Sequence, residues 1–333
     1  MKAFIIDRYA KKEVGRIADV PEPDMHDSDV LIQVHAAGVN LLDAKIRSGE
    51  FKLVLPYRMP LILGNDVAGT VLKVGASVTR FKPGDEVYAR PDQDRIGTFA
   101  ERIAINNASL AHKPTNLSME EAASIPLVAL TAWQVLVETA KLKRGQKVLI
   151  HAGSGGVGTL AIQLAKHLGA FVATTTSTAN VEWVKALGAD VVIDYCKQDF
   201  AAELRGYDVV LNSLGGDVLK KSLQVLKPGG HLISISGPPT PEFATEQKLP
   251  WPLKLVMRLL SRSIRKLAEQ HGMRYSFVFM RAEGKQLSDI TALIEAGAIR
   301  PVVEQVMPFR ATAEALAHVV HGRAKGKVVI TMR

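Results

Sequence analysis

Three glycines with the spacing G-x-G-x-x-G stand where an apolar segment meets a helix-patterned one. Gly153, Gly155 and Gly158 follow the apolar residues 147–152 and precede residues 159–167, whose pattern predicts a helix. Such a loop lets the backbone turn tightly and approach a pyrophosphate, while the helix directs its free N–H groups at the phosphates. The sequence therefore predicts dinucleotide binding, with a ligand-free glycine turn as the alternative. The candidate phosphate-binding loop comprises Gly153, Ser154, Gly155, Gly156, Val157 and Gly158.

The segment after the next predicted strand bears on which dinucleotide is bound. Proteins that select NAD usually carry an acid about 20 residues past the first glycine, where it binds the ribose 2′-hydroxyl. Here residues 174–178 are all Thr or Ser, and the nearest acid, Glu182, lies a full turn into the following helix. Hydroxyl groups can donate to a 2′-phosphate that a carboxylate would repel. The sequence therefore favours NADP(H), bound by Thr176 and Ser177, with Tyr195 as a further hydroxyl or adenine contact.

The elements that must position these residues change in kind along the chain. Residues 1–123 alternate short apolar segments with turns and predict a mostly β region, with one helix over 41–47. Ser118 and Glu121 form a capping box, and a long helix is expected over 128–142. Strands then alternate with helices, which predicts an α/β fold with a parallel, doubly wound sheet. The predicted strands of that sheet are 147–152, 171–176, 191–195, 207–213 and 231–236, and the tail returns to a strand at 300–309, a helix at 311–321 and a strand at 327–332.

Composition is typical of a soluble globular protein with two domains. The chain has 333 residues, 47% of them hydrophobic and 23% charged, and no apolar run long enough to span a membrane. The first residues predict a strand and not a signal peptide. The single cysteine, Cys196, excludes an internal disulfide and a multi-cysteine zinc site, and a cytoplasmic location is the default expectation.

The net charge of +9 is concentrated in one segment. Residues 254–281 hold seven basic residues against one acid, Glu269, so the charge does not predict a nucleic-acid-binding surface. Within this segment, residues 253–267 have the pattern of a basic amphipathic helix. We expect that helix to pack at the mouth of the substrate site or at a dimer contact, and it is also a candidate for weak contact with a membrane surface. Its expected apolar stripe is Leu253, Val256, Met257, Leu260, Ile264 and Leu267.

Motifs along almost the whole chain occur in the order of one known superfamily. They are residues 37–43, 64–69, 81–88, 97–101, 122–126, 131–132, 153–158, 185–190 and 326–329. By their order and spacing the chain resembles the medium-chain dehydrogenases/reductases, and it is most similar to their zinc-free quinone oxidoreductase and 2-alkenal (enone) reductase branch. The resemblance implies a GroES-like β-barrel catalytic domain of residues 1–123 and 300–333, a Rossmann domain of residues 124–299 and an active site in the cleft between them.

The resemblance also implies further cofactor contacts and a homodimer. Related proteins often have a lysine where this chain has Asn180, so the expected grip on the 2′-phosphate is weaker here. The other implied cofactor contacts are Thr131, Leu214, Ser236, Gly237, Phe277 and Phe279.

Two positions test the resemblance for zinc. Zinc alcohol dehydrogenases of this superfamily have a cysteine where this chain has Asn40, and a His-Glu pair where it has Asn65-Asp66. A catalytic zinc needs about three protein ligands from Cys, His, Asp or Glu, so no metal site is expected. Without a Lewis acid, hydride transfer to a quinone or to the β-carbon of an α,β-unsaturated carbonyl is favoured over alcohol/carbonyl interconversion.

Two side chains are the candidate catalytic residues. The resemblance implies that Asn40 lies near the nicotinamide as an orienting group or oxyanion donor, with capping of the following helix as the structural alternative. Some enoyl reductases of this superfamily place a tyrosine acid where this chain has Phe51, and Tyr57 is close enough in sequence to replace it. The expected substrate is a small apolar quinone, enone or enal. A zinc-independent carbonyl/alcohol oxidoreductase, a zinc alcohol dehydrogenase and a non-catalytic NADP(H)-binding interaction or redox-sensing protein stay open as alternatives.

Overall fold

The chain folds into two compact units. A computed structural model of the chain describes residues 1–11, 15–322 and 325–332. The residues outside these ranges all fall in the expected catalytic domain. One unit is made of both ends of the chain, residues 1–130 and 281–333, and the other of residues 131–280. Both boundaries differ from those expected at 123/124 and 299/300.

One helix accounts for most of the difference at the second boundary. Helix α10 (Gly284–Glu295) falls in the range that the sequence assigned to the Rossmann domain, but it packs in the first unit. The Tyr88 hydroxyl donates to Leu287 O at 2.8 Å, and Asn116 Nδ2 donates to Ile294 O at 3.1 Å. The chain therefore returns to the first unit before this helix begins.

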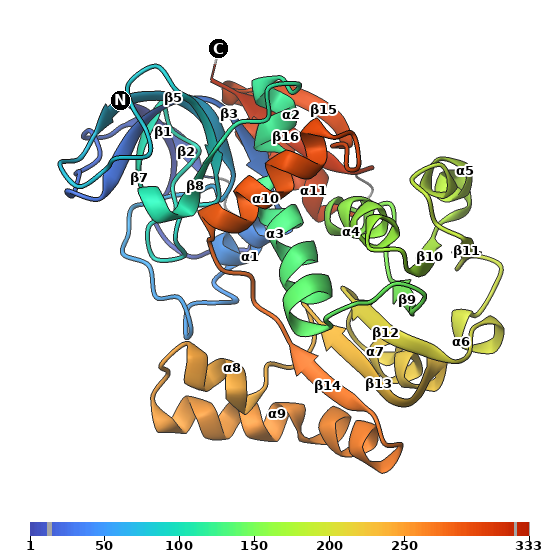
Figure 1. Cartoon of the computed structure of the whole chain (residues 1–333). Helices are drawn as coiled ribbons and strands as arrows, with labels where there is room; N and C mark the ends of the chain where they lie inside the picture. Colours follow the sequence, from blue (N-terminus) through green and yellow to red (C-terminus); the bar gives the residue numbers. More distant parts are fainter. Residues whose placement is uncertain (12–14, 323–324, 333) are drawn as a thin grey trace. The chain divides into compact units, whose positions relative to one another are not determined.

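The second unit is built on a six-stranded sheet in which every neighbouring pair is parallel (Figure 1). The order β11-β10-β9-β12-β13-β14 is 3-2-1-4-5-6 when the strands are counted within the unit, which is the order of a Rossmann sheet. The predicted doubly wound sheet is therefore confirmed. Its strands are β9 (Lys147–Ile150), β10 (Phe171–Thr176), β11 (Val191–Asp194), β12 (Tyr207–Asn212), β13 (Leu226–Ser234) and β14 (Arg274–Phe277).

The helices of this unit follow the strands as expected, but one helix and one strand differ from the prediction. The stretch predicted as one helix over 128–142 is α3 (Pro126–Trp133) continued by a π-helical segment, Gln134–Thr139, in which Ala140 N donates to Val135 O at 2.8 Å. The fifth predicted strand begins earlier and ends at Ser234 instead of Ser236. The remaining helices are α4 (Gly156–His167), α5 (Val181–Lys185), α6 (Phe200–Glu203), α7 (Asp217–Lys221), α8 (Pro241–Glu246) and α9 (Trp251–Gln270).

Helix α9 is the basic amphipathic helix, and the stripe that it buries shares Met257 and Ile264 with the expected one but differs in its other residues. Met257, Ser261, Ile264 and Ala268 are buried, at the spacing of one helix face. Val256 and Leu260, which were expected in the buried stripe, are 47% and 58% exposed. The prediction was wrong for these two because α9 is apolar on more than one side, so periodicity alone did not identify the packed face. No helix among the described residues is long and apolar enough to cross a bilayer.

The first unit contains a seven-stranded and a three-stranded sheet. Apart from the parallel pair β15-β16, the paired strands are antiparallel. The orders are β15-β16-β3-β5-β6-β8, with β7 also on β3, and β2-β1-β4. The strands are β1 (Lys2–Ile6), β2 (Arg16–Asp19), β3 (Asp29–Val39), β4 (Leu61–Ile62), β5 (Val67–Val74), β6 (Glu86–Ala89), β7 (Arg102–Asn106), β8 (Leu110–His112), β15 (Val303–Pro308) and β16 (Lys327–Thr331).

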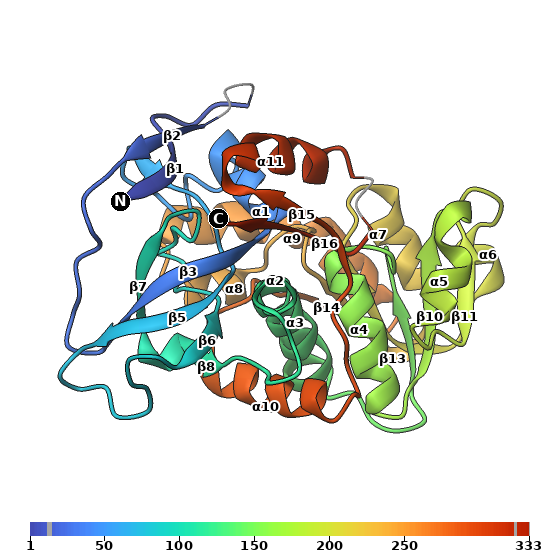
Figure 2. The same ribbon diagram turned by 90° about the horizontal axis from the view of Figure 1, so that it is seen from above.

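The C-terminal tail completes the first unit. Strand β16 pairs with β3, with Ile330 opposite Ala37, and its residues Val328 and Ile330 are fully buried in the core of this unit. Figure 2 shows α11 (Thr312–Val320) beside α1 (Leu41–Ser48), two helices from opposite ends of the chain. The pairing of β16 with β3 brings Lys327, the first residue of β16, beside the segment where β3 passes into α1.

The capping box of α2 (Met119–Ala123) at Ser118 is confirmed.

Candidate active site

A buried lysine joins the C-terminal tail to the two polar positions singled out in the sequence. Lys327 Nζ donates to Asn40 Oδ1 at 2.5 Å, to Asp66 Oδ2 at 3.0 Å and to Val39 O at 3.1 Å. Asn40 Nδ2 donates to the same Asp66 oxygen at 2.8 Å. The side chains of Lys327 and Asp66 are 6% and 0% exposed, so water does not screen their charges. We call Asn40, Asp66 and Lys327 the buried ion-pair network.

The other polar atoms of the network are also satisfied within the first unit. Asp66 Oδ1 accepts from Leu127 N at 2.7 Å, and Asn40 Nδ2 also donates to Gly38 O at 3.3 Å. Gly38 must be glycine, because a Cβ there would lie 2.4 Å from Ala123 O. Both acceptors of the Asn40 amide are thus groups of this chain. These bonds hold the Asn40 side chain in one orientation. Its contact with a substrate stays a prediction.

Asp43, near the start of α1, is a buried carboxyl group with a raised pKa. Its carboxylate accepts from Asn40 N at 2.7 Å and from Asn65 Nδ2 at 2.6 Å. Burial raises the pKa of Asp43 to about 7, against the opposing effect of these two donors. Asn65 Oδ1 is buried without a hydrogen-bond partner among the described residues. A rotated Asn65 amide would accept from the protonated carboxyl, so the pair can satisfy either protonation state.

This titration predicts a pH dependence of stability. The native protein keeps the Asp43 proton up to about pH 7, whereas the unfolded chain loses it near pH 4. The native state therefore binds more protons in this window, and the contribution of Asp43 to the free energy of unfolding falls as pH rises from about 4 to about 7. Urea unfolding should be measured for the wild type and Asp43→Asn across this range. The free energy of unfolding of the variant should rise relative to that of the wild type up to about pH 7, and the difference should be constant above it. A difference that is independent of pH, or has the opposite trend, contradicts the raised pKa.

A second buried cation lies near Tyr57 and was missed in the sequence. The Tyr57 hydroxyl donates to Gln93 O at 2.5 Å, and burial raises its pKa, although the field of Arg90 lowers it. Arg90 is 1% exposed; its Nη1 donates to Pro91 O at 2.6 Å, and its Nε has no hydrogen-bond partner among the described residues. Burying a cation with an unmatched donor lowers the stability of the folded state, and this marks the position of Arg90 as a candidate functional site. The sequence signal was an arginine directly after the apolar strand β6.

The donor set of the first unit does not fit zinc. An ammonium group already binds the Asp66 carboxylate and the Asn40 oxygen, and a divalent cation there would be repelled by it. Among the residues that the structure describes, no group of three His, Cys, Asp or Glu side chains could hold a metal ion.

In the second unit, the glycine loop has the close contacts that its spacing predicts. A Cβ at Gly158 would lie 2.3 Å from Ala152 O, and one at Gly153 would lie 2.2 Å from Thr174 Oγ1, so both must be glycine. Gly155 differs, because its Cβ would meet only Ala152 O at 3.4 Å and otherwise open space. Helix α4 starts directly after Gly155 without a capping side chain, which leaves its first N–H groups free for a phosphate. The loop fits a dinucleotide pyrophosphate.

The carboxyl edge of the parallel sheet carries unmatched polar atoms. Thr176 Oγ1 and Asn212 Nδ2, at the ends of β10 and β12, are buried with no hydrogen-bond partner among the described residues. Ligands of such sheets bind at this edge. Asn180 is committed elsewhere, because it donates to Ser177 Oγ at 3.0 Å and accepts from Trp183 Nε1 at 3.0 Å. It holds the turn after β10 in place.

An acid that was not predicted from the sequence lies beside this turn. Asp194 ends β11 and pairs with Thr176 in the parallel register. It accepts from Thr178 Oγ1 at 2.7 Å and from Cys196 N at 3.1 Å, and these bonds, the Thr178 hydroxyl first, hold its pKa below the usual value. Asp194 is 18 residues from Thr176 along the chain, and the parallel register of β10 and β11 brings the two together. Tyr195, predicted as a cofactor contact, is 61% exposed.

The other predicted cofactor residues lie on several elements of this unit. Ser236 N and Gly237 N both donate to Ser234 Oγ, at 3.3 and 2.7 Å, so the turn after β13 is fixed. Thr131 is buried on α3, and Leu214, which follows β12, is 37% exposed. Their contacts with a cofactor stay predictions.

Phe277 and Phe279 are joined by an aromatic residue that the sequence did not suggest. Phe243 of α8 packs edge-on against Phe277, with ring centroids 5.1 Å apart, and against Phe279 at 5.8 Å. The three rings form one aromatic cluster at the end of β14. Phe243 is buried, while the two partners are only partly covered.

Comparisons with known proteins agree with this architecture. Residues 26–115 match a family described as alcohol dehydrogenase GroES-like domain, and residues 187–330 match one described as zinc-binding dehydrogenase. The chain is 35% identical, over 100% of its length and 91% of the other protein, to the mitochondrial NAD(P)H oxidoreductase RTN4IP1 of Danio rerio. It is 34% identical to the chloroplastic NADPH-dependent alkenal/one oxidoreductase of Arabidopsis thaliana, covering 99% of this chain and 79% of that protein. The structure of a quinone oxidoreductase from Coxiella burnetii superimposes with a TM-score of 0.87 at 31% identity, over 100% of this chain and 99% of that one.

A Rossmann unit together with a GroES-like unit defines the class of protein. The chain belongs to the medium-chain dehydrogenase/reductase superfamily and, within it, to the quinone oxidoreductase and enone reductase branch. It is an enzyme of the oxidoreductase class.

Proposed function

We propose that this enzyme uses NADPH to reduce quinones or the activated C=C bond of α,β-unsaturated carbonyl compounds. The observation that carries the proposal is the buried ion-pair network. Lys327 binds the oxygens of Asp66 and Asn40, so the positions that hold metal ligands in zinc relatives carry an internal cation instead. A conjugated acceptor suits such a site because its developing charge spreads onto a carbonyl oxygen that hydrogen-bond donors can stabilise. The similarity to proteins named as quinone and alkenal/one oxidoreductases supports the same chemistry.

The residues of the chain have separate tasks in this proposal. The nicotinamide supplies a hydride when the cofactor is bound. Gly155 and the uncapped start of α4 bind the pyrophosphate, and the ion-pair network fixes Asn40. Tyr57 is the candidate proton donor to a carbonyl oxygen, and its hydroxyl has to leave its hydrogen bond with Gln93 O to act as one. Arg90 offsets negative charge that develops on that hydroxyl.

Steady-state kinetics test the proposal. NADPH oxidation should be measured with a panel of enones, enals and quinones, with simple ketones and aldehydes as the comparison. We expect turnover with conjugated acceptors and at most slow turnover with saturated carbonyls. Tight NADPH binding without turnover of any acceptor would instead favour a non-catalytic role.

The preference for NADPH over NADH is proposed to rest on the hydroxyl-rich turn after β10, and Asp194 opposes it. The carboxylate repels a 2′-phosphate placed at that turn, so Asp194→Asn should improve kcat/KM for NADPH relative to NADH by about three- to tenfold. Asp190→Asn is the matched control, because it removes the same charge just before the other end of β11. The ratio should not change in the control. An equal effect of both variants would contradict a local role of Asp194.

A cytoplasmic location and a homodimeric state also stay proposals. The single cysteine, Cys196, is free and exposed, which suits a reducing compartment. Two similar proteins are named as mitochondrial or chloroplastic, so the location needs its own test by cell fractionation. Sedimentation velocity of the purified protein tests the dimer.

A further inference from the structure

Helix α9 turns apolar side chains to solvent along the side opposite its buried stripe. Trp251, Leu255 and Leu259 are spaced by four residues and are 75%, 49% and 59% exposed. Single exposed apolar residues are ordinary, but a contiguous row on one helix marks an interaction surface. We call the surface formed by Trp251, Leu255, Val256, Arg258, Leu259, Leu260, Arg262 and Lys266 the α9 outer face.

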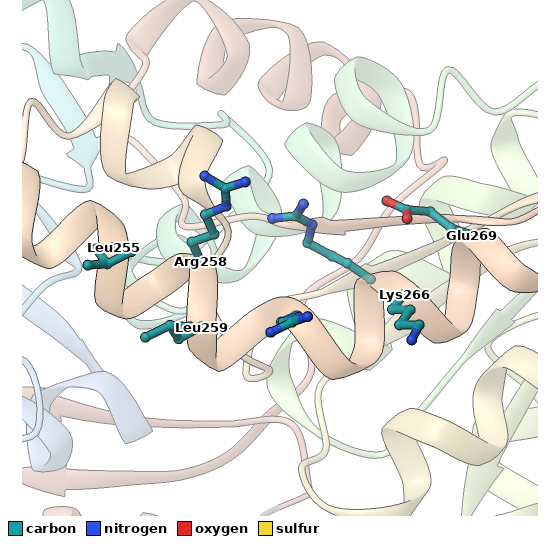
Figure 3. Close-up of a pocket in the computed structure, with 7 residues that line it drawn as sticks. Leu255, Arg258, Leu259, Lys266 and Glu269 are labelled. Carbon is teal, nitrogen blue, oxygen red and sulfur yellow. The ribbon is translucent and has the colours of Figure 1, made fainter.

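Cations accompany this apolar row. A surface groove runs along α9, and all the residues that line it belong to this one helix: Leu255, Arg258, Leu259, Arg262, Arg265, Lys266 and Glu269. Figure 3 shows Leu255 and Leu259 next to each other, with Lys266 and Glu269 farther along the helix. Among the described residues, Arg258, Arg262 and Lys266 form no ion pair. The α9 outer face therefore presents exposed hydrocarbon and unneutralised positive charge together.

We propose that the α9 outer face binds the surface of an anionic lipid bilayer, with the helix lying in the plane of the interface. Interfacial helices combine an apolar row of Trp and Leu with Lys and Arg, as this one does. The leucines and Trp251 enter the boundary of the acyl chains, while Arg258, Arg262 and Lys266 contact lipid phosphates. The charges argue against the alternatives. A second copy would bring like charges together, and a nucleic acid offers nothing to cover three exposed leucines.

Vesicle co-sedimentation tests this proposal on the full-length protein. The vesicles are phosphatidylcholine alone, or phosphatidylcholine with roughly one third phosphatidylserine. We expect binding to the anionic vesicles, a blue shift of the fluorescence of exposed Trp251, and weaker binding at high salt. The double variants Leu255→Gln/Leu259→Gln and Arg258→Gln/Arg262→Gln should each lower the partition coefficient at least about tenfold.

Matched substitutions elsewhere control for general changes in hydrophobicity and charge. Leu53→Gln/Leu72→Gln replaces two leucines that are 69% and 42% exposed, and Lys73→Gln/Lys82→Gln removes two exposed cations. Both controls should bind anionic vesicles as the wild type does, and circular dichroism should show all variants folded. The proposal is overturned if the wild type does not bind, or if the controls lose as much binding as the α9 variants. It is also overturned if only the arginines matter, as for a soluble polyanion, or if the leucine variant abolishes a dimer seen by sedimentation velocity.

Discussion

Replacing Lys327 by Met should lower the free energy of unfolding by about 3–5 kcal/mol, the largest effect on stability that we expect from a single substitution in this chain. The substitution leaves the Asp66 carboxylate fully buried without its ammonium partner. It also removes one donor to the Asn40 oxygen, which frees the amide to rotate. Urea unfolding monitored by circular dichroism measures the change.

A double substitution separates the loss of charge balance from the loss of packing. In Lys327→Met/Asp66→Asn no charge is left unpaired, and the Asn40 amide can rotate to accept from the side-chain amide introduced at position 66. We expect the double variant to recover at least half of the lost stability. Lys73→Met, which alters an exposed lysine, should change the free energy of unfolding by less than about 0.5 kcal/mol. If Lys327→Met costs under about 1 kcal/mol, or if the double variant is no better than the single, the buried ion pair lacks the role given to it here.

The second large effect concerns cofactor binding. Gly155→Ala should weaken NADPH binding at least about tenfold while leaving the free energy of unfolding within about 0.5 kcal/mol of wild type. The backbone of Gly155, at φ −84° and ψ 168°, is accessible to alanine, and its Cβ would meet only Ala152 O at 3.4 Å. The added methyl group therefore fills space that the fold does not use but a phosphate does. Isothermal titration calorimetry and urea unfolding give the two quantities.

Gly158→Ala is the contrasting variant in the same loop. Its Cβ would lie 2.3 Å from Ala152 O and 2.7 Å from Gly153 Cα, so the loop must shift. We expect losses of both stability, by about 1–3 kcal/mol, and NADPH affinity. Unchanged binding in Gly155→Ala would show that the pyrophosphate does not approach this glycine.

The second unit could be predicted from the sequence because its signals are local. Alternating apolar strands and helices identified five of the six strands of the parallel sheet, all but β14, and β10 has the predicted bounds of Phe171–Thr176. The glycine loop was recognisable for the same reason. The face by which α9 packs could not be predicted from the sequence, because a helix that is apolar on two sides does not specify which side meets the sheet.

The residues of the first unit's site depend on contacts between distant parts of the chain. Lys327 is 287 residues from Asn40 and 261 from Asp66, so only the register of β16 on β3 brings them together. The family motifs of the sequence include Asn40, Asp66 and Lys327, but the sequence does not predict that the three side chains bind one another. The burial of Arg90 and the pairing of Asp194 with Thr176 likewise arise from tertiary packing and strand register.

Transfer of deuterium from labelled cofactor is the most direct test of the proposed reaction. The enzyme is incubated with a cyclic enone and NADPH carrying deuterium at the transferable position of C4, and the product is analysed by NMR and mass spectrometry. The proposal predicts a saturated ketone with deuterium on the β-carbon. An allylic alcohol with deuterium on the carbonyl carbon, or no oxidation of NADPH by any enone or quinone, would contradict it.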